Sequence, residues 1–292
     1  MNHSEKKALE FVTKHRLKFY AVGILLIFFI LSIGSHYAYD AITGESITYS
    51  DESGHTEGDT SSCNVLGINL HGDLYTYVPE SNDDELMSNK DVVGSEEIMS
   101  ALISADEDEA IKAVIIEVDS AGGYPVAGEE IAKTIRSVSK PVVAFIRQSG
   151  TSAAYWSIIT ADKIFASKNS DVGSIGVTIS YLENVAKNEK DGVKYVQLSA
   201  GKYKDAGSPD KLLTEEEKAI IVRDLKIVHE NFIQDIAESR NIPIDRVRSI
   251  ADGSSVLGEK AKELGLIDEI GGFLEVKKYV EEKIGEEADI CW

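Results

Sequence analysis

The sequence predicts an α/β domain with a largely parallel β-sheet, and three observations lead to this fold class. Short apolar runs such as AVIIEV (113–118) and PVVAFI (141–146) are typical of strands buried on both faces of a parallel sheet. The segments between these runs place apolar residues at helical spacing. Because strands and helices alternate along the chain, we expect parallel pairing through right-handed crossovers.

The elements follow one another from Asn64, where the folded part of the sequence is expected to begin. Strands are indicated by apolar runs, and helices by an apolar stripe or by a proline in the first turn. In chain order, the sequence predicts a strand at 64–72, a helix at 93–110, a strand at 113–118, a helix from Pro125, a strand at 141–146, a loop at 147–151, a helix from Ser152, a strand at 163–166, a glycine-bracketed turn at 173–177 and a strand at 194–198.

A long helix is expected to begin after Thr214. Thr214 and Glu217 have the spacing of a capping box, in which the side chains and backbone of the first helical turn bond reciprocally. The apolar stripe of this helix consists of Ile221, Leu225, Val228, Phe232 and Ile236. A small C-terminal module at 255–272 follows, and we expect the domain to span residues 64–282, with a tail at 283–292.

An apolar segment near the N-terminus predicts a membrane anchor. Residues 19–39 contain no Asp, Glu, Lys or Arg, and about 20 apolar residues suffice for a helix to cross a bilayer. Basic residues precede this segment and acidic residues follow it, so the positive-inside rule places residues 1–18 in the cytoplasm and the folded domain outside. A cleaved signal peptide is the alternative, but the run is long for one and no clear small-x-small cleavage site follows it.

Residues 40–63 predict a flexible linker, since they contain six acidic residues, no Lys or Arg, and too few apolar residues to form a core. The whole chain carries 30 Lys and Arg against 50 Asp and Glu, a formal net charge of −20, which argues against general nucleic-acid binding. Cys63 and Cys291 are too few for a zinc site or a disulfide framework. We expect either two free thiols or, in an oxidising compartment, one disulfide that joins the two ends of the domain.

The positions of the six histidines indicate that any catalytic base is not a histidine. Only His71 and His229 lie in the folded part, and each is expected to be structural or exposed. The sequence has no HExxH motif, no cluster of metal ligands and no phosphate-binding loop, so we expect no metal ion and no cofactor. A hydrolase with this sequence would therefore need another base, and lysine is the alternative used in Ser–Lys sites.

Two segments have the local properties that a Ser–Lys site needs. In SGTSAAYW, Ser152 is expected at the start of a helix, where unpaired N–H groups favour an oxyanion. The alternative is that Thr151 or Ser152 only caps this helix. In DSAGG, Gly122 and Gly123 free the backbone to present N–H groups to a carbonyl oxygen. The alternative there is an ordinary tight turn.

Two lysines, Lys202 and Lys204, lie in the glycine-flanked segment SAGKYKDAGSP after the last predicted strand. A lysine that acts as a general base must be neutral near pH 7, which requires its pKa to fall by roughly 3 units from about 10.4. Burial in an apolar setting can supply this shift. Whether either lysine is buried does not follow from the sequence.

Six motifs occurring in one order carry a family resemblance. They are VDSAGG, GTSAAY, ADKIFA, GSIGV, GKYKDAGSP and LGEKAKELGLIDEIGG. With an apolar anchor before them, these motifs resemble the short, single-domain form of the signal peptide peptidase A family of membrane-anchored serine proteases. The resemblance implies a crotonase-like, Clp-protease-like α/β spiral that assembles into rings.

The resemblance also implies roles for individual residues. Ser152 matches the nucleophile, and Lys204 matches the general base, whereas Lys202 does not. Ser174 matches a serine whose hydroxyl helps to hold the lysine amine. In the short forms of the family, the serine and the lysine of one site come from neighbouring subunits. We therefore expect a homo-oligomer with shared active sites and an inactive monomer.

The resemblance assigns the oxyanion hole to Gly122 and Gly123, with the N–H of Ala153 as a second donor. The chain departs from the family pattern at two places. Ala153 and Ala154 stand where two glycines are usual, and Ala121 stands where proline is usual. All three side chains are small, so we expect activity to survive these changes, although the shape of the substrate groove is affected.

The implied activity is hydrolysis of peptide bonds, without a cofactor, through an acyl-enzyme on Ser152. The expected substrates are apolar peptides near the membrane, such as cleaved signal peptides, at the outer face of the cell membrane. Two other classes stay open from the sequence. One is a crotonase-type enzyme that acts on acyl-CoA, and the other is a non-catalytic membrane scaffold on the same fold.

Overall fold

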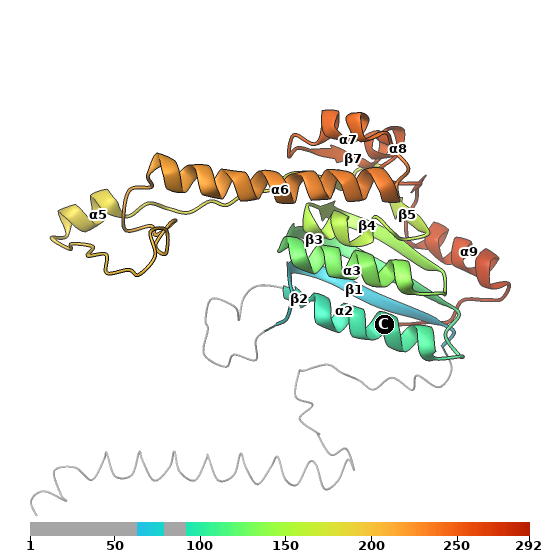
Figure 1. Cartoon of the computed structure of the whole chain (residues 1–292). Coiled ribbons are helices and arrows are strands. Elements are labelled where there is room, and N and C mark those ends of the chain that lie inside the picture. Colours follow the sequence, from blue (N-terminus) through green and yellow to red (C-terminus); the bar gives the residue numbers. More distant parts are fainter. Residues whose placement is uncertain (1–62, 79–91) are drawn as a thin grey trace, which may run out of the picture. The chain divides into compact units, whose positions relative to one another are not determined.

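The computed structural model describes residues 63–78 and 92–292 (Figure 1). The predicted cytoplasmic segment 1–18, the predicted anchor 19–39 and all but the last residue of the predicted linker lie outside the described residues. Within the described ranges, no helix is both long enough and apolar enough to cross a membrane.

The described residues form nine strands and eight helices. The strands are β1 (Val65–Tyr75), β2 (Val92–Gly94), β3 (Ala113–Gly123), β4 (Val142–Thr151), β5 (Lys163–Ala166), β6 (Asp171–Gly173), β7 (Ser255–Leu257), β8 (Glu269–Ile270) and β9 (Ile290–Cys291). The helices are α2 (Ser95–Glu107), α3 (Pro125–Ser137), α4 (Ala153–Ile158), α5 (Val185–Lys190), α6 (Glu215–Ser239), α7 (Ile244–Ile250), α8 (Gly258–Leu264) and α9 (Phe273–Ile284).

The strands belong to one sheet with the order β2-β1-β3-β4-β5-β8. Beside this path, β6 pairs with β4, β7 pairs with β6, and β9 pairs with β1. All of these pairs are parallel except β6 with β7. The predicted α/β fold with a largely parallel sheet is therefore confirmed.

Helices cover both faces of the sheet, which explains the continuous apolar run in β3. Ile116 belongs to a core that contains Leu102 of α2 and Ile131 of α3. The preceding residue, Ile115, points to the opposite face and belongs to a second core, which contains Val276 of α9. Because successive side chains of a strand point to opposite faces, a central strand covered on both sides needs apolar residues at consecutive positions.

Two central strands extend further than their apolar runs predict. Residues 147–151, expected as a loop, form the end of β4, and the glycines of DSAGG form the end of β3. The extension arises from pairing, since Ser120 lies beside Gly150 and β4 continues along β6. These polar and glycine residues are thus held in strands by their neighbours and not by an apolar pattern of their own.

The predicted strand at 194–198 is not formed. These five residues have no strand partner in the described chain, and Leu198 is 93% exposed. They belong to a projecting segment, residues 179–214, which we call the arm. No residue of the arm is buried, and Figure 1 shows α5 and its flanking connections beyond the N-terminal end of α6, away from the sheet. Alternating apolar residues need a neighbouring strand to form a sheet, and the part of the chain that the structure describes supplies none here.

Helix α6 joins the arm to the core. The capping box predicted at Thr214 and Glu217 is present. At the other end of the helix, Phe232 and Ile236 are buried, and the ring of Phe232 stacks on Trp156 of α4 with 4.4 Å between centroids. The predicted apolar stripe is therefore buried only in the C-terminal part of α6, because its N-terminal part runs out along the arm.

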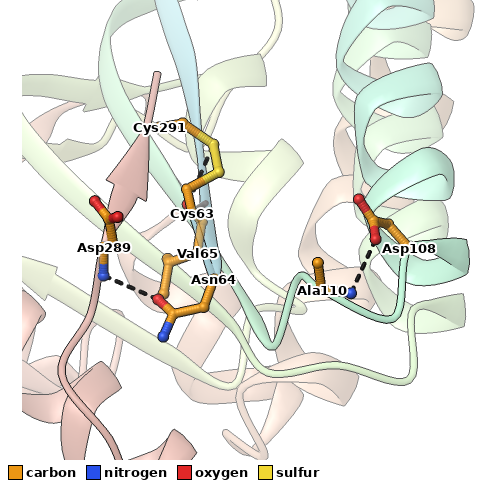
Figure 2. The surroundings of a disulfide bond; sticks show 7 residues. All are labelled: Cys63, Asn64, Val65, Asp108, Ala110, Asp289 and Cys291. Atoms are coloured by element: carbon orange, nitrogen blue, oxygen red, sulfur yellow. Dashed lines mark hydrogen bonds between the residues drawn. A yellow bond between two sulfur atoms is a disulfide. The ribbon is translucent and has the colours of Figure 1, made fainter. Parts of the chain in front are cut away.

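A disulfide joins Cys63, just before β1, to Cys291 of β9 (Figure 2). Of the two states left open by the sequence, the structure therefore has the single disulfide between the ends of the domain. Next to it, the backbone N–H of Asp289 donates to Asn64 Oδ1 at 2.9 Å. Residues 283–292, expected to form a tail, thus include a strand that pairs with β1 and a covalent link to the start of the domain.

Candidate active site

Ser152 occupies a sharp turn between strand β4 and helix α4. Its backbone has φ 53° and ψ −128°, a conformation that residues other than glycine rarely adopt. The turn is held in place by the N–H of Ser152, which donates to the Gly173 carbonyl at 2.7 Å. Strained serines at strand-to-helix turns are a feature of nucleophile elbows, because the turn exposes the hydroxyl above the sheet.

Neither residue at the start of α4 acts as a cap. Ser152 is in the N-cap position, but its side chain makes no capping hydrogen bond. The hydroxyl of Thr151 donates instead to the Ala121 carbonyl, with 3.1 Å between the oxygens. The alternative role that the sequence left open for these two side chains, capping of α4, is therefore wrong.

The glycines of DSAGG pass directly beside Ser152. Gly122 has φ 111°, and a Cβ atom placed on it would lie 2.8 Å from Ser152 Cβ. A Cβ on Gly123 would lie 2.0 Å from the carbonyl oxygen of Leu74. Both positions thus require glycine, for different reasons. An ordinary tight turn does not describe this segment, since the glycines end strand β3 against the candidate nucleophile.

The N–H groups predicted to stabilise the oxyanion differ in whether they already donate a hydrogen bond within the protein. The N–H of Gly122 donates to Ser120 Oγ at 3.1 Å, so in this conformation it is occupied. Ala153 is the first residue of α4, where helical N–H groups have no partner within the helix. Gly123 and Ala153 both line the pocket described below, whereas Gly122 is not among its lining residues.

A pocket of about 470 Å³ opens beside Ser152. It is assembled from the ends of β3 and β4, the starts of α3 and α4, the segment after β6, helix α6 and the turn before β7. Its lining residues are Gly123, Pro125, Ser152, Ala153, Trp156, Ser174, Gly176, Val177, Thr178, His229, Phe232, Ala251, Asp252 and Gly253. The apolar part of this wall could accommodate an apolar side chain of a bound peptide.

Ser174 lies on the wall of the same pocket. Like Ser152 it has a positive φ, 51°, and its hydroxyl donates to the Gly253 carbonyl at 2.9 Å. Its backbone N–H donates to the Ser254 carbonyl at 3.1 Å. The structure therefore brings Ser174 to the pocket, where the turn at 252–254 holds it in place.

Two titratable side chains line the pocket. His229 of α6 donates from Nε2 to the Ile175 carbonyl at 3.3 Å, and so links this helix to the turn that carries Ser174. Asp252 accepts hydrogen bonds from the hydroxyl and backbone N–H of Ser254, which lower the pKa of its carboxyl. Within the described ranges, no group of three or more His, Cys, Asp or Glu side chains could hold a metal ion.

Lys204 lies on the arm and not at the pocket. Its neighbours Lys202 and Tyr203 contact Glu216 in the first turn of α6, at 2.5 Å and 3.4 Å. His229, on the pocket wall, is thirteen residues further along the same helix, which at 1.5 Å per residue is about 20 Å. Lys204 is accordingly not among the residues that line the pocket with Ser152.

The ion pair with Glu216 also bears on the choice between the two lysines. The carboxylate of Glu216 raises the pKa of Lys202 well above its usual value, because the charged ammonium donates to it. Lys202 is therefore the lysine that a carboxylate of its own chain engages. Lys204 is exposed, and the part of the arm around it is held by hydrogen bonds that Tyr195 and Ser199 donate to Asp205.

Several pocket residues were not found by sequence reasoning. Trp156 was given no role beyond its place in the helix expected from Ser152, Phe232 was placed on the apolar stripe of the long helix, and His229 was expected to be structural or exposed. The turn at 251–254 has an ordinary Asp-Gly-Ser composition. No local signal distinguishes these residues, because the pocket forms only when segments about 80 residues apart meet.

Comparison with known proteins assigns this geometry to a family. A family model described as peptidase family S49 matches residues 134–286, just over half of the chain. The chain belongs to peptidase family S49. The matched region of this S49 chain begins within α3 and contains Ser152, Ser174 and Lys204.

Two relatives of this S49 chain illustrate the extent of the similarity. The protein named "Putative protease MJ0651", from Methanocaldococcus jannaschii, is 36% identical over 175 residues, 59% of this chain and 56% of the relative. The "Putative signal peptide peptidase SppA" of Enterococcus faecium is 30% identical over 218 residues, 74% of this chain and 62% of the relative. The matches thus span less than two thirds of either relative.

Among solved structures, a ClpP1 mutant from Listeria monocytogenes aligns with a TM-score of 0.46 and 16% sequence identity. The alignment covers 72% of this chain and 92% of that chain.

Proposed function

We propose that this S49 chain is a serine peptidase with a Ser–Lys dyad, in which Ser152 is the nucleophile. The observation that carries the proposal is the backbone of Ser152. A strained conformation persists only where the surrounding structure imposes it, and such strain concentrates at functional sites. Membership of a peptidase family and a pocket directly beside the hydroxyl support the same conclusion.

The chemistry begins with attack of Ser152 Oγ on the scissile carbonyl, while the hydroxyl proton passes to the neutral amine of Lys204. The carbonyl oxygen becomes an oxyanion, which the N–H groups of Ala153 and the glycine turn stabilise. The C–N bond then breaks, and the lysine ammonium donates its proton to the leaving amine. Water hydrolyses the resulting ester of Ser152 with the same lysine as base.

We further propose that Lys204 reaches Ser152 from a neighbouring copy of the chain, in a ring-shaped homo-oligomer. The separation of about 20 Å along α6 supports this assignment. The arm supports it as well, since Leu182 and Leu198 are 88% and 93% exposed and would be expected to pack against another surface. Packing of the arm against a second copy would also remove Lys204 from solvent, as the role of a general base requires.

The proposed substrates are peptides with apolar side chains near the membrane, such as cleaved signal peptides. Pro125, Trp156 and Phe232 in the pocket wall support an apolar preference. The proposed location is the outer face of the cell membrane, with residues 19–39 as the anchor. The disulfide between Cys63 and Cys291 supports an oxidising compartment, since disulfides persist there and are rare in the cytosol.

Mixing two inactive variants tests the proposal. Ser152→Ala lacks the nucleophile and Lys204→Ala lacks the base, so each alone should lose turnover of an apolar peptide substrate. If one site takes its serine and its lysine from adjacent subunits, random co-assembly in equal amounts should restore about a quarter of the wild-type activity. Fluorophosphonate labelling should modify Ser152 in the wild-type assembly.

Each outcome has a distinct meaning. Retained turnover in Ser152→Ala removes this serine from its role. Loss of activity in both variants, with no recovery on mixing, would show that the two residues act within one chain. A wild-type assembly that is neither labelled nor able to cleave peptides would contradict the peptidase and leave the scaffold or the acyl-CoA enzyme.

A further inference from the structure

We propose that Thr151 is a positioning residue. Its hydroxyl holds the glycine turn of the predicted oxyanion hole, Gly122 and Gly123, in a fixed position relative to Ser152. The inference rests on the proposed function, and it concerns a side chain that is not among those lining the pocket. Thr151 is 8% exposed at the end of β4, directly before the candidate nucleophile. Its hydroxyl donates to the Ala121 carbonyl at 3.1 Å, which joins the nucleophile's strand to the glycine turn on β3.

The peptide unit between Ala121 and Gly122 is anchored at both of its polar groups. Thr151 holds its carbonyl, and its N–H donates to Ser120 Oγ at 3.1 Å. Ser120 is itself fixed, since its hydroxyl donates to the Gly72 carbonyl of β1 at 2.6 Å. Because a peptide unit is planar, fixing both groups determines the orientation of the whole unit.

The turn needs this support because two glycines follow the anchored peptide. Glycine has the largest conformational freedom of any residue, and Gly122 already adopts φ 111°. N–H groups stabilise an oxyanion effectively only when they are oriented before the reaction starts. Thr151 is covalently attached to Ser152, so its hydrogen bond fixes the distance between the nucleophile and the donors that follow Gly122.

Removal of the hydroxyl should therefore affect the chemical step. In the assembled enzyme, Thr151→Val is expected to lower kcat for a peptide substrate about 10- to 100-fold, with KM changed by less than about 2-fold. Thr151→Ser keeps the hydroxyl and should restore most of kcat. The matched control is Thr160→Val, because Thr160 makes a similar bond to the Ala132 carbonyl at 2.7 Å outside the pocket.

A second readout does not depend on activity. Hydrogen exchange of residues 119–124, measured by mass spectrometry, should accelerate in Thr151→Val and stay at the wild-type rate in Thr151→Ser and Thr160→Val. Urea unfolding confirms that each variant is folded, and Thr151→Ala is a second hydroxyl-free variant should Val not be accommodated.

The outcomes separate this inference from the proposed function. If Thr151→Val has the same kcat and the same exchange rate as Thr160→Val, the positioning role is overturned, but the proposed peptidase activity is unaffected. A parallel loss of kcat in Thr151→Ser overturns it too, since the hydroxyl would not be the cause. If the wild-type assembly is not labelled by fluorophosphonate, the peptidase fails, and the exchange of residues 119–124 alone decides whether Thr151 holds the turn.

Discussion

At the scale of single residues, the site places a strained serine beside a glycine that adopts positive φ without strain. Ser152 and Gly122 both have positive φ, and only one of them is a glycine. A conformation of this kind costs about 1–3 kcal/mol for a residue with a side chain. The proposed role of the serine hydroxyl accounts for this cost at position 152, because a glycine there would relieve the strain but remove the proposed nucleophile.

Gly122→Ala should impair the reactivity of Ser152 in addition to the loss of stability that positive φ causes in alanine. The new methyl group would meet Ser152 Cβ at 2.8 Å, so the nucleophile or the turn must move. We expect fluorophosphonate labelling to fall at least 10-fold and the free energy of unfolding to fall by about 1–3 kcal/mol. Gly285→Ala is the control, since Gly285 also has positive φ, 76°, but no atom within 4 Å of a Cβ. Equal labelling of both variants would contradict the close approach.

At the scale of elements, helix α6 connects the buried core beside the pocket to the solvent-exposed arm. Its C-terminal part is anchored by stacking of Phe232 on Trp156 and by the bond that Trp156 Nε1 donates to Asp235 at 2.8 Å. Its N-terminal part carries the arm, where the apolar side chains are exposed. A rigid helix between the pocket and an exposed apolar arm suits an element that reaches a neighbouring molecule.

Charged residues on the arm should separate the assembly without unfolding the domain. Leu182→Glu combined with Leu198→Glu places charges in the most exposed apolar positions of the arm, so sedimentation should show a smaller species and turnover should be lost. The free energy of unfolding should change by less than about 0.5 kcal/mol, because exposed positions contribute little. Leu274→Glu is the control, since Leu274 is 76% exposed on α9. Unchanged mass in the arm variant would contradict the role of the arm.

At the scale of the whole molecule, the disulfide closes nearly the entire domain into one loop. Cys63 and Cys291 are 228 residues apart in sequence, and the short β9 that carries Cys291 pairs with only two residues of β1. So short a strand pair is weak by itself. The covalent link therefore secures the C-terminal strand at the place where the predicted linker enters the domain.

Loss of this link should lower the stability of the domain. Replacement of both cysteines by serine is expected to cost roughly 2–5 kcal/mol in the free energy of unfolding, since a long loop is released in the unfolded chain. Urea unfolding of the wild type with and without a reductant measures the same quantity. The double serine variant should not respond to the reductant, and a wild type that is equally stable when reduced would contradict this prediction.

Some features of this protein follow from local sequence alone. Apolar periodicity is a property of neighbouring residues, so it predicted the α/β class and the central strands, and the local spacing of Thr214 and Glu217 predicted the capping box of α6. The motifs around Ser152 and Gly122 are local too, and they marked the two turns that meet at the pocket. The predicted strand at 194–198 failed for the converse reason, because a strand exists only where another strand pairs with it.

Other features were decided only by the tertiary structure, because they depend on contacts between residues that are distant in sequence. The local pattern is compatible with free or paired cysteines, and with a serine that caps a helix or one that faces a pocket. Long-range packing chose between them, by bringing Cys63 to Cys291 and by directing the Thr151 hydroxyl to Ala121. It also placed Lys204 on the arm, beside the first turn of α6, whereas the pocket is lined by residues nearer the other end of that helix.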